Sequence, residues 1–107
     1  MDADFDEFLH VPARLSIVAL LAPVSWADFA FVRDAVDTSD SALSKQLSAL
    51  AAKGYVEVRR QKSLRGQRTL ARLTAQGREA FRRHAASLER IAATARAPEP
   101  HPADPAT

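Results

Sequence analysis

The fold of this chain is decided by residues 39–74, SDSALSKQLSALAAKGYVEVRRQKSLRGQRTLARLT. Apolar residues in the first part recur at the spacing of one helix face, and these are Leu43, Leu47, Leu50 and Ala51. Gly54 ends this predicted helix. Residues 55–60 and 69–73 then alternate as strands do, and a turn around Gly66 joins them. The segment therefore predicts a helix over residues 39–53 that is followed directly by a β-hairpin.

The predicted hairpin is strongly basic. Its cationic side chains are Arg59, Arg60, Lys62, Arg65, Arg68 and Arg72. Alternation along the first strand places Val56 and Val58 on one face, with Glu57 and Arg59 on the other. Gly66 gives the turn its conformational freedom.

Charge is unevenly distributed along the chain. Residues 1–40 hold two basic and eight acidic side chains, whereas residues 45–83 hold eleven basic and two acidic ones. This asymmetry favours a polyanionic partner for the basic part, and a solvated basic surface is the simpler alternative. Cysteine is absent, which excludes disulfides, thiolate metal sites and a cysteine nucleophile. We find no leader and no apolar run of ~18 residues, so we expect a cytoplasmic protein without a membrane partner.

The other segments predict further helices. Pro12 suits the first turn of a helix that Pro23 ends, and the side chains expected to be buried there are Leu15, Val18, Ala19 and Ala22. Trp26 and Ala27 are expected to form a short extended piece. The predicted N-caps of the later helices are Asp28 for residues 29–36, Ser39 or Thr38 for the third helix, and Thr74 for residues 75–96.

Two short helices joined by a tight turn and followed by a hairpin form a winged helix-turn-helix. The predicted fold class is therefore α+β, mainly α with a small β-hairpin, and with a long C-terminal helix. The expected parts are an acidic arm (1–10), a winged-helix domain (11–74), a dimerisation helix (75–96) and a disordered proline-rich tail (97–107).

The polar side of the third helix and the hairpin together predict a DNA-binding surface. With Leu43 and Leu47 inward, the opposite side of the helix carries short hydroxyls and one lysine. The predicted DNA-binding residues are Ser41, Ser44, Lys45, Ser48, Arg59, Lys62, Arg65, Gln67 and Arg68. Lys45 can reach a guanine edge or a phosphate, and Arg65 is expected to enter a minor groove. The helix has no Arg or Asn for a bidentate base contact, so we expect modest direct readout.

The long helix has a heptad-like seam that predicts a homodimer. Phe81, Ala85, Leu88, Ala92 and Ala95 fall four and three residues apart, and Ile91 widens the seam. Folding back on the first helix is the alternative, which we expect for Phe81. The predicted dimer interface consists of Phe5, Leu9, Leu88, Ile91, Ala92 and Ala95.

Four stretches resemble the small MarR/ArsR-like winged-helix transcriptional regulators. They are residues 11–21, residues 28–36, residues 39–56, and the strand-to-helix junction at residues 72–78 with its Leu-Thr, two residues, Gly pattern. The resemblance implies a homodimer, a palindromic operator and repression, and it supports the DNA contacts named above. Asp37 departs from the pattern, because it stands where a glycine often ends the second helix.

The resemblance also raises the question of an effector. The metal-sensing branch would need a cysteine pair, which is missing, and His10, His84 and His101 lie far apart in the sequence. We therefore predict no metal and no cofactor, with each histidine at the surface or partly packed, and a metal site at the dimer interface is the alternative. By analogy with ligand-responsive relatives, the resemblance also implies a small-molecule effector of unknown identity. Trp26 and Phe31 are expected to be core or scaffold residues, with an effector pocket as the alternative.

Two other functions compete with sequence-specific regulation. A winged helix can serve as a protein–protein interaction module, in which case the basic hairpin would bind an acidic partner. An enzyme is the weakest hypothesis, because the sequence has no glycine-rich phosphate loop, metal cluster, or paired nucleophile and base.

Overall fold

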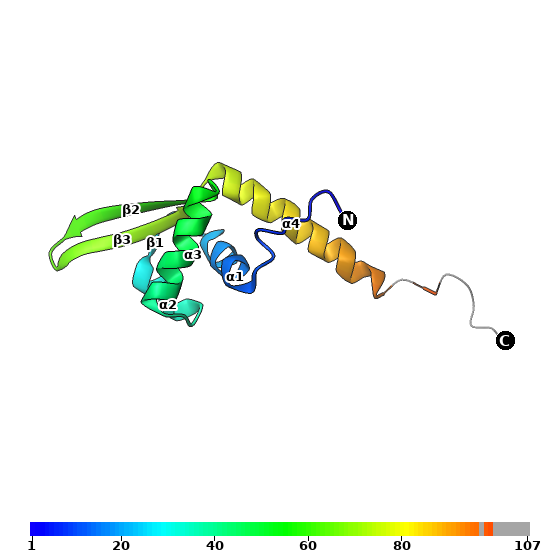
Figure 1. The fold of residues 1–107 in the computed structure, drawn as a ribbon, viewed down its shortest axis with the longest axis horizontal. Helices are drawn as coiled ribbons and strands as arrows, with labels where there is room; N and C mark the ends of the chain where they lie inside the picture. The colour runs from blue at the N-terminus through cyan, green and yellow to red at the C-terminus, as the bar shows by residue number, and fades with distance from the viewer. Residues whose placement is uncertain (97, 100–107) are drawn as a thin grey trace.

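The computed structural model describes residues 1–96 and 98–99. The elements are α1 (Pro12–Leu21), β1 (Ala27–Asp28), α2 (Phe29–Ala35), α3 (Asp40–Ala52), β2 (Val56–Ser63), β3 (Gly66–Leu73) and α4 (Ala75–Thr94). This order confirms the predicted winged helix-turn-helix with its long last helix (Figure 1). Most of the predicted disordered tail, namely residues 97 and 100–107, lies outside the described residues. Among the described helices, none combines the length and the apolar content needed to span a bilayer.

The hairpin is longer than predicted and its turn is shorter. β2 and β3 pair antiparallel up to Ser63 opposite Gly66, which leaves a loop of only Leu64 and Arg65. Gln61, Lys62, Gln67 and Arg68, which were expected in the turn, are therefore strand residues. Gly66 has a φ of 111°, so the tight loop uses the conformational freedom of glycine. β1 adds a third strand beside β3, and it confirms the expected extended piece at Ala27.

Side-chain caps begin three of the helices as the sequence predicts. Asp28 accepts from the backbone N–H of Ala30, Ser39 from that of Ala42, and Thr74 from that of Gly77. Such caps satisfy N–H groups that have no partner inside the helix. They fix where α2, α3 and α4 start. Asp37, in the turn before α3, has a φ of 54°, the left-handed conformation that favours glycine.

The core forms where α1, α3 and the sheet meet. Its fully buried side chains include Leu9, Ile17, Val18, Leu21, Val32, Leu43 and Leu50. The prediction for α1 was partly wrong, because Ile17 and Leu21 are buried whereas Ala19 is exposed. Burial of the larger side chains of Ile17 and Leu21 is more favourable than burial of Ala19. The helix is therefore rotated about its own axis relative to the expected orientation. Ala51 of α3 is likewise exposed, and the buried stripe of that helix is Leu43, Leu47 and Leu50.

The junction between α3, β2 and α4 requires a glycine. A Cβ atom on Gly77 would lie 2.0 Å from the carbonyl oxygen of Tyr55, so no other residue fits there. Thr74 joins the same junction, since its hydroxyl donates to the carbonyl of Gly54 at 2.6 Å. Gly54 itself has a φ of 88°. The Leu-Thr-x-x-Gly pattern therefore closes the hairpin onto the start of α4.

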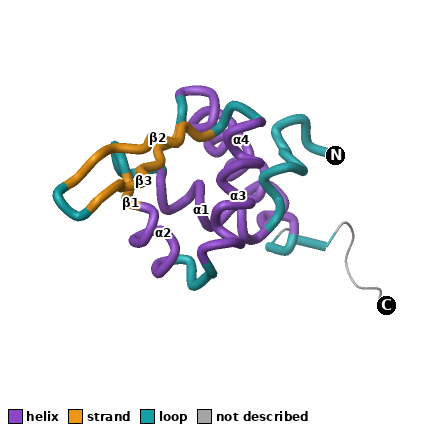
Figure 2. Tube along the Cα trace, turned by 60° about the vertical axis from the view of Figure 1, so that its left-hand side comes forward, coloured by secondary structure: helices purple, strands orange, loops and turns teal. Residues whose placement is uncertain are grey.

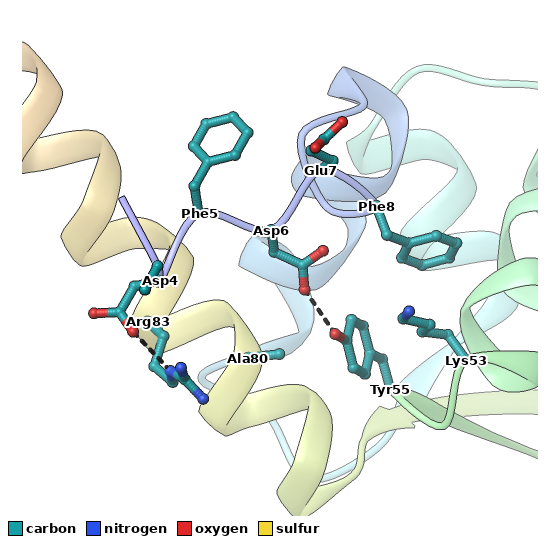
Figure 3. Close-up of a pocket in the computed structure, with 10 residues that line it drawn as sticks. Asp4, Phe5, Asp6, Glu7, Phe8, Lys53, Tyr55, Ala80 and Arg83 are labelled. Atoms are coloured by element: carbon teal, nitrogen blue, oxygen red, sulfur yellow. Dashed lines mark hydrogen bonds and ion pairs between the residues drawn. The ribbon is translucent and has the colours of Figure 1, made fainter. Parts of the chain in front are cut away.

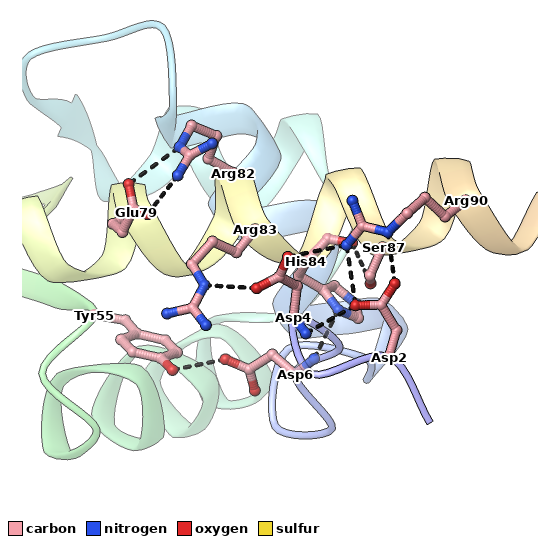
Figure 4. Close-up of polar contacts among 10 residues, drawn as sticks. All are labelled: Asp2, Asp4, Asp6, Tyr55, Glu79, Arg82, Arg83, His84, Ser87 and Arg90. Carbon is pink, nitrogen blue, oxygen red and sulfur yellow. Dashed lines mark hydrogen bonds and ion pairs between the residues drawn. The ribbon is translucent and has the colours of Figure 1, made fainter.

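The acidic arm, residues 1–10, packs along α4 (Figure 4). Asp2 pairs with Arg90 at 2.6 Å, and Asp4 pairs with Arg83 at 2.9 Å. The hydrogen bond and charge of Arg90 lower the pKa of Asp2 to about 2. Leu9 is fully buried in the chain's own core, which contradicts its assignment to a dimer interface, because it has no surface left for a second copy.

His84 of α4 is fully buried beneath this arm. Its Nδ1 accepts the backbone N–H of Asp6 at 2.9 Å, and its Nε2 lies 3.3 Å from Nδ1 of His10. The ring of Phe5 contacts both imidazoles, with centroids 4.8 Å apart in each case. The expectation that His84 lies at the surface or is partly packed was therefore wrong, since the arm folds back over 74 residues of sequence and covers it. His84 must be neutral in this arrangement, because Nδ1 is a hydrogen-bond acceptor.

The burial of His84 predicts that stability falls in acid. Desolvation and the neighbouring His10 lower the pKa of His84, against a smaller opposite effect of Asp6. The unfolded chain protonates its histidines near pH 6.5, so below that pH the unfolded state binds a proton that the folded state excludes. We expect urea unfolding at fixed protein concentration to show a stability that declines from pH 7 to pH 5. His84→Gln should remove up to about one proton, or ~1.4 kcal/mol per pH unit, from that dependence.

His10→Gln is the matched control, because His10 is exposed. It should leave most of the pH dependence in place. A His84→Gln variant with the same pH dependence as the wild type would contradict the neutral, buried imidazole.

Candidate nucleic-acid interface

The outer side of α3 is free, as predicted. Ser41, Ser44, Lys45 and Ser48 are all exposed, and the chain's own core does not cover them. Asp40, in the first turn of the helix, pairs with Arg33 of α2 at 2.9 Å. This pair partly neutralises the carboxylate closest to the polar side, which reduces its repulsion of an anionic ligand.

The register of the hairpin divides its side chains between two faces. Residues directly opposite each other in an antiparallel pair share a face. Val58 lies opposite Ala71, Arg60 opposite Thr69, and Lys62 opposite Gln67. We call this side the near face, because Val58, Arg60 and Thr69 border the same groove as α3. The far face carries Glu57, Arg59 and Gln61 of β2, opposite Arg72, Leu70 and Arg68 of β3.

A groove of about 420 Å³ separates α3 from the near face. The helix contributes Ser44, Ser48 and Ala51, and the hairpin contributes Val58, Arg60 and Thr69. Three hydroxyls and one guanidinium line it, and these groups hydrogen-bond to phosphate oxygens. The remaining lining includes the apolar Phe29 and Leu47 and the carboxylate of Asp40, which is paired with Arg33. The exposure of Ala51, which the sequence analysis placed in the core, follows from its position on this wall.

The arginines of the far face are held by partners within the chain. Arg68 pairs with Asp28 at 3.2 Å, and Arg72 pairs with Glu57 at 2.8 Å. The guanidinium carbon of Arg59 lies 4.5 Å from the ring centroid of Trp26. Arg59 and Arg68 were predicted to bind DNA, yet both lie on the side away from α3.

The near face and the tip carry cations without such partners. Within the described part of the chain, no ion pair involves Arg60, Lys62 or Arg65. Arg65 sits in the two-residue loop at the end of the hairpin, which extends away from the helices (Figures 1 and 2). Arg60 is absent from the predicted DNA-binding set. Arg60 lies two residues after Val58, so strand alternation places both side chains on the same face. Assigning the near face from Val56 and Val58 would therefore have identified Arg60 from the sequence.

A second pocket lies between the acidic arm and α4 (Figure 3). Its volume is about 440 Å³, and its lining includes Phe8, Lys53, Tyr55 and Arg83. The Tyr55 hydroxyl donates to Asp6 at 2.6 Å, and both burial and this contact raise its pKa to about 12. Trp26 and Phe31 line neither this pocket nor the groove. Among the described residues, no group of three or more His, Cys, Asp or Glu side chains is placed to hold a metal ion.

Comparisons with known proteins agree with this architecture. A family model described as a winged helix DNA-binding domain matches residues 13–92. A transcriptional regulator homologue from Pyrococcus horikoshii OT3 is 26% identical, with a TM-score of 0.78 over 83% of this chain and 88% of that one. The comparison with curated proteins found no match.

Two other solved structures share the fold at lower identity. The PcaV transcriptional regulator from Streptomyces coelicolor, solved with its natural ligand, is 23% identical, with a TM-score of 0.69 over 94% of this chain and 68% of that one. ZitR from Lactococcus lactis, a zinc-responsive MarR family member, is 22% identical, with a TM-score of 0.59 over 78% of this chain and 57% of that one.

The division of the hairpin into two faces predicts unequal roles for its cations. Replacing Arg60 and Lys62 with alanine should weaken binding to any duplex DNA. The slope of log affinity against log salt is negative, and each lost phosphate contact should reduce its magnitude by about 0.9. Arg68→Ala is the control, because it removes a positive charge from the far face. A salt titration in which Arg68→Ala reduces the slope and the near-face variant does not would reverse our assignment of the two faces.

Proposed function

We propose that this chain, which belongs to the family of winged-helix DNA-binding domains, is a dimeric repressor that binds a palindromic operator. Membership of the family, together with the MarR-like neighbours, makes it a transcriptional regulator. The observation that supports the finer proposal is the groove between α3 and the near face of the hairpin. It sets the hydroxyls of Ser44 and Ser48 opposite Arg60, across a groove with a volume of about 420 Å³.

We assign α3 to the major groove, which admits a helix. Ser41 and Lys45, on its exposed side, would then contact base edges or phosphates. The positive N-terminal end of this 13-residue helix adds attraction for a phosphate. Short hydroxyls and a single lysine give few bidentate base contacts, so DNA shape would supply part of the specificity.

We assign the hairpin to the backbone and the adjacent minor groove. Arg65 at its tip would enter the minor groove, while Arg60 and Lys62 would neutralise phosphates along the way. Phosphate bound in the groove would meet donors from both elements at once. This arrangement fixes the orientation of the protein on the duplex, which phosphate contacts generally do.

The second copy is proposed to bind the distal half of α4. The apolar stripe of this 20-residue helix continues past the residues that its own domain covers. Leu88 is half-buried, Ile91 is 44% exposed, and Ala92 and Ala95 are exposed. The helix is about 30 Å long and projects beyond α1 and the arm (Figure 1). Phe5 adds a half-buried ring beside it, so the interface we propose no longer includes Leu9.

The alternative is a winged helix whose basic hairpin binds an acidic protein. The match of residues 13–92 to a winged helix DNA-binding domain favours a nucleic-acid backbone over an acidic protein. A small-molecule effector remains part of the proposal, since PcaV was solved with its natural ligand.

Selection of bound duplexes from a random DNA pool tests the function directly. We expect enrichment of a two-fold symmetric site with half-sites about one helical turn apart. Lys45→Ala should weaken binding to the selected site more than to random DNA, by about 1–3 kcal/mol if it contacts a base edge. Lys53→Ala, at the opposite end of α3, is the matched control. No enrichment above the pool, with an acidic protein partner captured instead, would favour the alternative.

The dimer is tested by placing charge on the exposed stripe of α4. Leu88→Glu combined with Ile91→Glu should produce a monomer in sedimentation velocity, with weaker binding to the selected operator. Ala93→Glu introduces a negative charge on the opposite side of the helix, and it should remain dimeric. If the double variant sediments as the wild type does, α4 is not the interface.

A further inference from the structure

Trp26, the single tryptophan of the chain, connects both strands of the hairpin to the α1–α2 segment. It is half-buried and directly precedes β1, the short strand that pairs with β3. The guanidinium carbon of Arg59 on β2 lies 4.5 Å from its ring centroid, and that of Arg72 on β3 lies 4.6 Å from it. Both distances are within the range of a cation–π interaction.

Carboxylates hold the same guanidinium groups in place. Glu57 lies 2.8 Å from Arg72 and 4.0 Å from Arg59, so one carboxylate serves both arginines. Farther along β3, Arg68 pairs with Asp28, whose side chain also caps α2. We call this set the far-face clamp, and it consists of Trp26, Asp28, Glu57, Arg59, Arg68 and Arg72. Its three guanidinium groups are paired with two carboxylates, because Arg59 and Arg72 share Glu57.

The hairpin depends on contacts at its base. Residues 59–68 are all exposed, so the outer half of the ribbon buries no side chain of its own, and surface contacts such as those of Arg59 and Arg68 link it to the rest of the described chain. A two-stranded ribbon is only marginally stable alone and twists readily. On the near side, Val56, Ala71 and Leu73 are buried against the core. On the far side, the support comes from Leu70 and from the clamp.

We propose that Trp26 is a positioning residue that fixes the direction of the hairpin relative to α3. This inference rests on the proposed function, because the direction matters for binding Arg60, Lys62 and Arg65 to the same duplex that α3 reads. Loss of the clamp leaves every DNA-contacting side chain in the protein. It lowers the fraction of molecules whose hairpin points correctly, and apparent affinity falls by that fraction.

This role differs from direct binding in its dependence on salt. A side chain that neutralises a phosphate contributes to the slope of log affinity against log salt. A residue that acts only through the orientation of the hairpin changes the affinity and leaves that slope unchanged. The two roles are therefore separable in one titration series.

The test compares Trp26→Leu, which removes the π face but keeps apolar bulk, with Trp26→Phe, which keeps an aromatic face. Each exposed cation–π contact corresponds to about two- to fivefold in an equilibrium constant. We expect Trp26→Leu to bind the selected duplex about fivefold or more weakly at every salt concentration, with an unchanged slope. Trp26→Phe should recover part of the loss. Ser25→Ala, an exposed neighbour, should behave as the wild type.

Hydrogen exchange of the free proteins supplies a readout that does not involve DNA. Amides of residues 57–62 and 67–72 should exchange faster in Trp26→Leu, whereas amides of α1 and α3 should not. Wild-type affinity and slope in Trp26→Leu would overturn the proposal, as would equal loss of protection across the whole domain. A slope that falls by about two in Arg59→Gln combined with Arg72→Gln would also overturn it, because those arginines would then bind phosphate. Failure of the wild type to bind any duplex would instead refute the proposed function. The hydrogen-exchange data would still test whether Trp26 holds the hairpin in place.

Discussion

The pairing of β2 with β3 in one particular register is the constraint on which the binding surface depends. Arg60 opposite Thr69 places both side chains toward α3, and Gln61 opposite Arg68 places both away from it. A slip of one residue would exchange these faces, since side chains alternate along a strand. Burial of Val56, Ala71 and Leu73 at the base of the hairpin prevents that slip, because it would bring arginines into the core.

Ion pairs within the chain restrict the unpaired positive charge to part of the basic surface. The sequence places eleven basic side chains in residues 45–83, but several of them are neutralised locally. Arg83 pairs with Asp4 of the arm, Arg82 with Glu79, Arg72 with Glu57, and Arg68 with Asp28. Exposed pairs of this kind add little stability. Their larger effect is on the electrostatic field, because the cations left unmatched include Lys45 and the near face and tip of the hairpin.

The sequence predicted the features that arise from local chemistry. The three capping residues, the leucine stripe of α3 and the glycine at the tip each follow from the needs of a few neighbouring residues. The resemblance to known regulators added the order of the elements. The features that the sequence did not predict depend on contacts between residues distant in sequence. The arm meets α4 through Asp6 and His84, 78 residues apart, and no local pattern encodes that contact. The roles of Arg59 and Arg60 likewise depend on Trp26 and α3, which the strand pattern alone does not locate.

The buried imidazole and the clamp solve one problem at the two ends of the molecule. In each case a segment with little apolar area of its own, the acidic arm or the hairpin, must be held against a small domain. The arm is held because Leu9 is buried in the core and the backbone N–H of Asp6 donates to His84. Its polar contacts therefore surround a buried apolar side chain. The outer hairpin has no such anchor, and its charged groups must stay hydrated to bind an anion. Stacking of guanidinium groups on an aromatic ring meets both needs, because it orients a cation without removing it from water. The position of Trp26 at the foot of the hairpin follows from this requirement.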